Sequence, residues 1–277
     1  MKTTLKTFAK LNLSLLVHPI NSEGMHPIYS VFQTISLHDE IIIETSNKST
    51  INCSNPNVPT NSQNCLFQIY EAFKDKIKQP FCLTLKKNIP MGGGLGGGSS
   101  NAAAFLNFLN QKEKWNYSTN ELIDISKPFG SDIAFFLVGG TALVSEIGNK
   151  VQKLENTNQC YLLIFPAIHC NTKEIYQAFD KLKTTPLITK KEETFILNNY
   201  TGPNYLEAVV FEKYPIYQKI QNYIPNKTLK LSGSGAACFF ELTNDVEGIN
   251  IQNKLKLLAP ELKTTIVHSV TYAFQKS

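Results

Sequence analysis

The chain has 277 residues, enough for one large or two modest domains, and 42% of them are hydrophobic, as is usual in globular proteins. The formal net charge of +5 is mild and the lysines are spread along the chain, so we expect no nucleic-acid partner. No apolar run has the length of a membrane span and the N-terminus lacks a signal-peptide pattern, so we expect a cytoplasmic protein without a membrane partner.

The cysteines and the basic residues restrict which disulfide, metal and phosphate sites are expected. No two cysteines form a C-x-x-C pair, so we expect buried, reduced thiols and neither a disulfide framework nor a zinc knuckle. The six cysteines are Cys53, Cys65, Cys82, Cys160, Cys170 and Cys238. Every basic residue is lysine, since the chain has no arginine. Any phosphate must therefore be bound by backbone amides, lysines, hydroxyls and a metal ion.

The first 46 residues are rich in strand patterns. In KTFAKLNLSLLV the leucines alternate with polar residues, which places Lys10 and Asn12 on the face opposite the leucines. Asp39, in SLHDEI, is predicted to end a strand and mark a turn. A polar loop is expected over residues 47–64. A helix over residues 65–78 and a short strand, FCLTL, are expected to follow it.

The segment PMGGGLGGGSSNAAA (residues 90–104) contains six of the chain's 15 glycines and leads into a small-residue helix predicted over 101–109. Free amides ahead of a helix N-terminus favour an anion, and Ser99 and Ser100 are expected at the cap. A flexible linker is the alternative, although the run lies between a strand and a helix. The G-x-G-x-x-G within it lacks the acidic partner of a dinucleotide site, and serine stands where a P-loop has lysine.

The rest of the chain alternates helices and strands. Residues 119–126 predict a short helix, and residues 127–146 predict a turn, a buried helical piece and a strand. The strand YLLIFP opens a second half of alternating helices and strands, and no linker-like segment separates the halves. Because the polar stretch 155–159 is the natural boundary, we expect two domains, residues 1–155 and 156–277.

Four segments, taken in order, carry a resemblance to a known family: FAKLNLSL, PMGGGLGGGSS, FGSDIAFF and LSGSGAACFF. Together they resemble the GHMP kinases, such as galactokinase, homoserine kinase and mevalonate kinase. Within that superfamily they are most similar to the 4-diphosphocytidyl-2-C-methyl-D-erythritol kinases of the non-mevalonate isoprenoid pathway. Those kinases typically read P-A-K-I-N-L and G-A-D-V-P-F-F-L-x-G where this chain has residues 8–13 and 130–139.

The resemblance implies an α/β (α+β) fold of two GHMP-kinase domains, the second one ferredoxin-like, with the active site in the cleft between them. It implies transfer of the γ-phosphate of ATP to a hydroxyl of the methylerythritol moiety, with Mg²⁺ beside the ATP but with no protein ligand that can be named for the metal. A monomer or weak homodimer is expected. The ATP-binding residues would be Pro90, Met91, Gly92, Gly93, Gly94, Leu95, Gly96, Gly97, Gly98, Ser99 and Ser100.

Lys10 and Asp132 are the catalytic residues that the resemblance implies. An alcohol is a poor nucleophile until a base accepts its proton, and Asp132 can take that role. A positive charge on Lys10 would keep Asp132 ionised and favour alkoxide character in the hydroxyl. Each residue has a plainer alternative: Asp132 as the N-cap of a helix that begins at Ile133, and Lys10 as a solvated strand lysine.

The segment for substrate recognition departs from the family pattern. Typical relatives read R-x-D-G-Y-H, whereas this chain reads N-S-E-G-M-H, so Met25 replaces the stacking tyrosine and His26 remains to hydrogen-bond the base. Cytidine recognition is expected in altered form, although a loop histidine is more often a surface residue and the glycines of LSGSGA could form only a turn. The substrate-binding residues would be Asn12, Met25, His26, Thr172, Tyr176, Ser232, Gly233, Ser234 and Gly235.

Three other functions stay open: another GHMP kinase of the homoserine or mevalonate type, a non-catalytic binding protein on the same fold, and, more distantly, a Rossmann oxidoreductase. Homoserine kinases generally lack the aspartate base, and a protein that only binds needs no base. The segment 204–207 is interpreted as a helix start. The other histidines show no metal-ligand spacing and are expected to be structural or surface residues: His18, His38, His169 and His268.

Overall fold

The computed structural model describes residues 2–182 and 188–276. Its larger sheet is built on two long strands, β1 (Lys2–Asn12) and β3 (Ile28–Thr45), which pair antiparallel along the whole of β1. The strands run in the order β12-β1-β3-β5-β4, with β2 and β6 also on β3, and β7 on β6. The other strands of this sheet are β2 (Leu16–Val17), β4 (Thr50–Cys53), β5 (Phe81–Lys86), β6 (Thr141–Glu146), β7 (Lys150–Lys153) and β12 (Phe274–Lys276).

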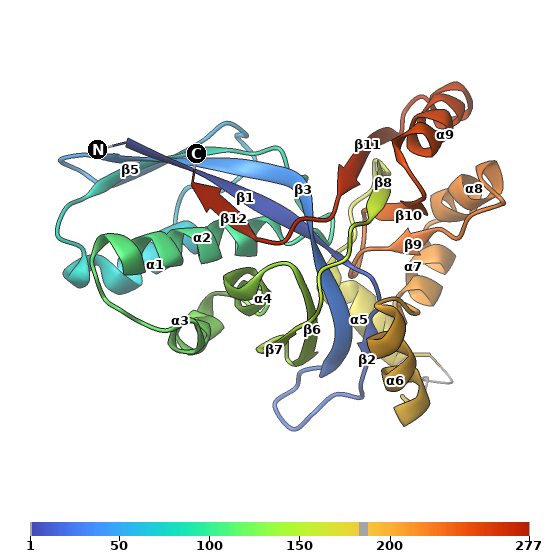
Figure 1. Cartoon of the computed structure of the whole chain (residues 1–277), viewed down its shortest axis with the longest axis horizontal. Helices are drawn as coiled ribbons and strands as arrows, with labels where there is room; N and C mark the ends of the chain where they lie inside the picture. The colour runs from blue at the N-terminus through green and yellow to red at the C-terminus, as the bar shows by residue number, and fades with distance from the viewer. Residues whose placement is uncertain (1, 183–187, 277) are drawn as a thin grey trace.

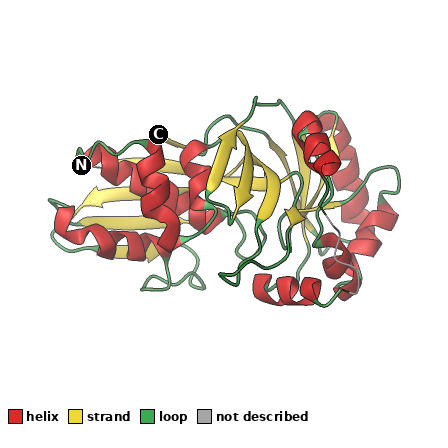
Figure 2. Ribbon diagram, turned by 90° about the horizontal axis from the view of Figure 1, so that it is seen from below, coloured by secondary structure: helices red, strands yellow, loops and turns green. Residues whose placement is uncertain are grey.

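Helices cover one face of this sheet (Figure 2), and the helix α2 (Gly97–Lys112) packs on β1 and β3. Its three successive alanines, 102–104, are fully buried, because small side chains let the helix approach β1 and the neighbouring helices. The predicted helix over 65–78 ends earlier, at Phe73, and continues as a 3₁₀ turn. The remaining helical elements here are α1 (Cys65–Phe73), η1 (Lys74–Lys76), α3 (Thr119–Ser126), η2 (Lys127–Phe129) and α4 (Ile133–Val138).

The smaller sheet is antiparallel and has the order β11-β8-β10-β9. Its strands are β8 (Cys160–Phe165), β9 (Lys230–Leu231), β10 (Cys238–Leu242) and β11 (Lys263–His268). The helices that accompany it are α5 (Thr172–Asp180), α6 (Lys190–Asn199), α7 (Glu207–Lys213), α8 (Ile216–Tyr223) and α9 (Asp245–Leu258). The segment 204–207 does lead into a helix, as the sequence indicates, whereas α6 had no counterpart among the predicted elements.

The two sheets lie side by side, and the chain crosses between them more than once (Figure 1). Leu13 and Leu15, which follow β1, pack into the same core as the strands of the smaller sheet. After β11 the chain returns to the larger sheet, where β12 pairs with β1, so the last strand lies beside the first (Figure 1). The last strand therefore lies outside the domain in which its sequence position places it, and the division at residue 155 stays a prediction.

Two expectations from the sequence are wrong. Asp39 is not in a turn: it lies within β3 and is fully buried. A strand tolerates this carboxylate because buried donors surround it, among them Lys87 and Asn101. All six cysteines are free, but Cys53, Cys65 and Cys82 are only partly buried; Cys53 and Cys65 pack at the margin of the core beneath the larger sheet. In the described parts of the chain, no helix has both the length and the apolar character needed to cross a membrane.

Candidate active site

The glycine run forms a loop that ends at the N-terminus of α2. The N-cap is Gly96, with φ of +68°, and not Ser99 or Ser100, which lie in the first helical turn. A left-handed backbone at the N-cap favours glycine over serine, so the helix begins before the serines. The first amides of any helix have no acceptor within the helix, and here they point with the positive end of the helix dipole toward the loop. The N-terminus of α2 can therefore bind an anion.

A cavity of about 350 Å³ lies over this helix end. The glycine loop forms one wall, and the segment before α1 together with Lys87 forms the other. All of the predicted ATP-binding residues line the cavity except Ser100, which is fully buried behind it. The lining residues are Val58, Pro59, Gln63, Asn64, Cys65, Leu85, Lys87, Pro90, Met91, Gly92, Gly93, Gly94, Leu95, Gly96, Gly97, Gly98, Ser99 and Asn101.

The glycines of this loop serve different purposes. A Cβ on Gly94 would lie 2.1 Å from the Ser232 carbonyl oxygen, and one on Gly96 would lie 2.7 Å from the Phe136 ring. A Cβ on Gly98 would meet nothing within 4 Å, although Gly98 lines the cavity. Gly94 and Gly96 therefore allow close protein packing, whereas Gly98 leaves open space over the helix end.

The SGSG loop (residues 232–235) is docked onto the glycine loop. Its neighbours Ala236 and Ala237 donate backbone hydrogen bonds to the carbonyls of Gly92 and Gly93, at 3.0 and 3.2 Å. Ser232 Oγ also donates to the Gly94 carbonyl, at 3.0 Å. The interpretation of LSGSGA as merely a turn is therefore incomplete, because this loop joins the second sheet to the wall of the cavity.

Lys10 and Asp132 meet beside the glycine loop. Lys10 Nζ lies 3.5 Å from Asp132 Oδ2, and the Lys10 backbone amide donates to the Leu95 carbonyl at 3.0 Å. The two side chains are 4% and 28% exposed, so the lysine is not the solvated strand residue of the plainer interpretation. Asp132 does occupy the N-cap position of α4, but its side chain makes no capping hydrogen bond. Its partly exposed carboxylate is therefore not used by the helix and can contact a bound molecule.

The surroundings of Lys10 hold its ammonium in one place. Lys10 Nζ donates to Asn12 Oδ1 and lies 4.6 Å from the centre of the Phe32 ring. Asn12 is itself fixed, because its side-chain Nδ2 donates to Ser30 Oγ at 3.1 Å and its backbone amide donates to Ser232 Oγ at 3.4 Å. Burial lowers the pKa of Lys10, and the Asp132 carboxylate offsets part of that effect.

His26 and Tyr176 lie together, with their rings in contact. Their ring centres are 5.2 Å apart, and the nearby Asp132 carboxylate adds to burial in raising the pKa of the Tyr176 hydroxyl. His26 Nδ1 contacts the His18 carbonyl at 2.8 Å, and Nε2 lies 3.2 Å from Asp180 Oδ1. Both ring nitrogens are thus occupied, so a hydrogen bond from His26 to a base requires that one of these contacts be given up.

The remaining predicted substrate residues lie on α5, on the SGSG loop and on the turn before β3. Thr172 Oγ1 and Ser234 Oγ are 2.8 Å apart, which links α5 to the SGSG loop. Met25 is 48% exposed, at the tip of a turn in which Asn21 Oδ1 accepts from the Met25 amide at 3.0 Å. Gly233 and Gly235 both have positive φ, as their turn requires.

The sequence did not indicate the buried pair of Asp39 and Lys87. Lys87 Nζ donates to Asp39 Oδ2, and their side chains are 6% and 0% exposed. Asp39 Oδ1 accepts from the amides of Asn88 and Ile89 at 2.8 Å, and Asn101 Nδ2 donates to Oδ2 at 3.1 Å. Lys87 is the one basic residue in the cavity lining given above, and its position shortly before the glycine run was the available signal.

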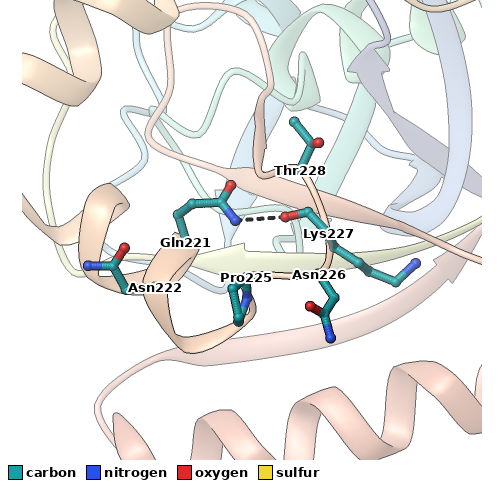
Figure 3. A pocket seen from close by; sticks show the side chains of 6 residues that line it. All are labelled: Gln221, Asn222, Pro225, Asn226, Lys227 and Thr228. Atoms are coloured by element: carbon teal, nitrogen blue, oxygen red, sulfur yellow. Dashed lines mark hydrogen bonds between the residues drawn. The ribbon is translucent and has the colours of Figure 1, made fainter.

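A second hollow, of about 440 Å³, lies at the end of α8, far along the chain from these residues (Figure 3). It is lined by Gln221, Asn222, Pro225, Asn226, Lys227 and Thr228. Gln221 Nε2 donates to the Lys227 carbonyl at 2.7 Å, which closes the turn there. The lining has no carboxylate and none of the predicted site residues, so the candidate active site remains the one at the glycine loop.

Comparison with known proteins agrees with this geometry. Residues 64–140 match the family model "GHMP kinases N terminal domain". The 4-diphosphocytidyl-2-C-methyl-D-erythritol kinase of Caldicellulosiruptor saccharolyticus is 34% identical, over 94% of this chain and 95% of its own length. That of Thermotoga maritima is 37% identical, over 86% and 91%. A crystal structure of 4-(cytidine 5'-diphospho)-2C-methyl-D-erythritol kinase has a TM-score of 0.78 at 23% identity, with 97% and 99% covered. The chain therefore belongs to the 4-diphosphocytidyl-2-C-methyl-D-erythritol kinase family, within the GHMP kinases.

Proposed function

We propose that this protein transfers the γ-phosphate of ATP to a hydroxyl of 4-diphosphocytidyl-2-C-methyl-D-erythritol, a step of isoprenoid biosynthesis. The observation that carries the proposal is the Lys10–Asp132 pair, 3.5 Å apart, next to the loop that ends at the N-terminus of α2. A base and a phosphate site side by side are what phosphoryl transfer to an alcohol requires, because there positioning and electrostatic stabilisation do most of the work. Membership of the kinase family supports the choice of substrate.

Asp132 would accept the proton of the attacking hydroxyl. Its exposed part can face the substrate, while Lys10 Nζ holds the carboxylate from the buried side. The same ammonium favours negative charge on the attacking oxygen as the proton leaves. The free amides at the start of α2 and the Lys87 ammonium would bind the phosphates, which suits a chain without arginine.

The first turn of α2 fits the Mg²⁺ that usually accompanies ATP. Ser100 Oγ is buried, with no hydrogen-bond partner among the described residues, and Ser99 Oγ faces Gly130, two residues before Asp132. Hydroxyl oxygens are suitable ligands for Mg²⁺, which takes its other ligands from phosphates and water. When bound there, the ion would neutralise negative charge on the phosphates.

The cytidyl end of the substrate would lie against Tyr176. The His26 and Tyr176 rings are too close to hold a base between them, so the base would stack on the face of Tyr176 that is turned away from His26. Thr172 and Ser234 would then contact the ribose or the diphosphate. In this arrangement the methylerythritol end would point toward Asp132. The Asp132 carboxylate is near enough to Tyr176 to contribute, after burial, to the raised pKa of its hydroxyl.

The deciding experiment supplies ATP, Mg²⁺ and one alcohol at a time, and measures both ADP and the phosphorylated product. The alcohols are 4-diphosphocytidyl-2-C-methyl-D-erythritol, homoserine and mevalonate. We expect product only with the cytidyl compound. Product with homoserine or mevalonate would assign the chain another activity of the superfamily. No product above that of Asp132→Asn with any alcohol would support a protein that only binds.

A further inference from the structure

Three potential metal ligands meet at one corner of the second sheet. Cys160 is the first residue of β8, His268 is the last residue of β11, and Asp245 is the first residue of α9. Cys160 Sγ lies 3.2 Å from Asp245 Oδ1, His268 Nε2 lies 2.7 Å from the same oxygen, and all three ligand atoms lie within 4.8 Å of one another. In residues 2–182 and 188–276 no other group of three such side chains is this close. None of the three belongs to the proposed kinase site.

The separations suit a tetrahedral ion. Zinc bonds of roughly 2.3 Å to sulfur and 2.0–2.2 Å to nitrogen or oxygen place neighbouring ligand atoms about 3.3–3.6 Å apart. The separation of Cys160 Sγ from Asp245 Oδ1, 3.2 Å, is close to this range, whereas that of His268 Nε2 from the same oxygen, 2.7 Å, is a hydrogen-bond distance. Rotation of the exposed Asp245 and His268 side chains would have to widen it for an ion to enter. A thiolate and an imidazole favour zinc over magnesium or calcium, which prefer oxygen ligands.

The backbone already holds these residues in place. Cys160 and His268 are direct partners in the antiparallel pairing of β8 with β11. The N-terminus of α9 is fixed by Asn244, whose Oδ1 accepts from the Glu247 amide at 3.0 Å. A site whose ligands sit at the ends of rigid elements needs little ordering when an ion binds.

The corner is also where the chain passes between the two sheets. The segment before Cys160 arrives from β7, and the segment after His268 leaves for β12 (Figure 1). The two segments are bonded to each other: Ser269 Oγ donates to the Thr157 carbonyl at 2.6 Å and accepts from the Gln159 amide at 2.9 Å. The His268 amide donates to Ser36 Oγ of β3 at 3.1 Å. An ion at this corner would connect both crossing segments to α9.

We propose that Cys160, Asp245 and His268 bind one Zn²⁺ ion, with water as the fourth ligand, and that the ion fastens α9 to the two segments that join the sheets. On binding, the Cys160 thiol loses its proton to solvent as the sulfur–zinc bond forms. Glu247, the nearest further carboxylate on α9, does not supply the fourth ligand, because it pairs with Lys227 at 2.9 Å and accepts from the Thr243 amide at 2.7 Å.

Cobalt titration of chelator-stripped full-length protein tests the proposal. We expect one equivalent of Co²⁺ to produce the absorption band of a thiolate bound to cobalt, and one equivalent of Zn²⁺ to abolish that band. Cys160→Ser should remove the band, while Cys82→Ser, at a half-buried thiol in the other sheet, should leave it unchanged. Asp245→Asn and His268→Gln should weaken Co²⁺ binding at least tenfold.

A thermal measurement covers variants that fold poorly. Zn²⁺ should raise the melting temperature of the unmodified protein and of Cys82→Ser, and should not raise that of Asp245→Asn. The proposal is overturned if the unmodified protein shows neither the band nor the thermal shift. A band that persists in Cys160→Ser overturns it as well, and so does unchanged Co²⁺ affinity in His268→Gln. None of these readouts depends on kinase activity.

Discussion

Two lysine–aspartate pairs lie beside the glycine loop, Lys87–Asp39 and Lys10–Asp132, and their carboxylates differ in burial and in the number of hydrogen-bond donors around them. Asp39 is fully buried, and Lys87, two backbone amides and Asn101 supply it with donors. Asp132 is 28% exposed, and among the residues that the structure describes its side chain has one polar partner, Lys10, at 3.5 Å. The first carboxylate has its hydrogen-bonding capacity filled, whereas the second keeps lone pairs for a substrate.

This difference separates a carboxylate that holds the fold from one that can take a proton. A base must be able to reach the hydroxyl and change its protonation state, and donors on every side oppose that change. Asp39 joins β3, the segment before the glycine loop and α2, so its effect on the site passes through the scaffold. The sequence shows two aspartates near motif residues; only the contacts show which one is available for chemistry.

The largest effect is expected for Asp132→Asn. The amide keeps the shape and can still accept from Lys10, but it cannot take a proton, so kcat should fall by ~10²–10⁴-fold. ATP affinity should stay within a few-fold, and the free energy of unfolding should change by about 1 kcal/mol or less. Single-turnover kinetics measure the rate of phosphoryl transfer, and nucleotide titration measures the ATP affinity. Near-normal turnover would show that Asp132 is not the base.

Asp39→Asn should show the opposite pattern. Loss of the charge leaves Lys87 buried without its counter-ion, which typically costs about 3–5 kcal/mol of stability. Chemical denaturation measures this loss of stability, and the double variant Asp39→Asn with Lys87→Met is the matched control. Since the double variant buries no lone charge, it should recover part of the loss. If Asp39→Asn were as stable as the unmodified protein, the contrast between the two pairs would fail.

Glu207 is a third carboxylate that supports the site, below the SGSG loop. Its Oε1 accepts from the Leu231 amide at 2.8 Å, and burial raises its pKa from 4.5 to about 7. The folded state therefore holds the proton more tightly than the unfolded state, so this residue's contribution to stability is lost as pH rises from 4.5 through 7. Glu207→Gln should be more stable than the parent at pH 8 by about 1–3 kcal/mol, with little difference at pH 4.5. Denaturation of both proteins across this range checks the sign, and parallel pH profiles would contradict it.

Tyr176→Ala sharpens the comparison at the substrate end of the cleft. Base stacking on an aromatic ring is worth roughly 1–3 kcal/mol, so affinity for the cytidyl substrate should fall at least fivefold while ATP affinity stays the same. Tyr176→Phe keeps the ring and should bind substrate like the parent. Substrate titrations on both variants give the answer. Unchanged affinity in Tyr176→Ala would make this residue part of the helix packing alone.

The main lines of the fold and the site follow from local sequence. The glycine run, the alternation around Lys10 and the helix start at Ile133 are each short-range patterns, and the family motifs supply their order. Those patterns predicted the α/β fold, the family and the kinase function, which the comparisons confirm.

What the sequence could not give depends on residues far apart in the chain. Asp39 looks like a turn residue until Lys87 and Asn101 surround it, and the corner of Cys160 and His268 forms only when β8 pairs with β11. Spacing along the chain carries no signal for such contacts. His26 is a subtler case, since its ring nitrogens are engaged by His18 and by a residue of α5.

Gly98 separates access for a phosphate from backbone packing in the glycine loop. Gly98 lies in the first turn of α2 with open space around its missing Cβ, whereas a Cβ on Gly94 would strike the Ser232 carbonyl. Gly98→Val should thus fold normally and weaken ATP binding about tenfold, or ~1.4 kcal/mol, because its side chain enters the cavity where the phosphates would lie. Gly94→Ala should instead lower stability and affect both ligands, since it pushes the SGSG loop away. The measurement is a nucleotide titration and a substrate titration on each folded variant. If Gly98→Val binds ATP as tightly as the parent, the phosphates do not lie over the start of α2 and the nucleotide site must be sought elsewhere in the cleft.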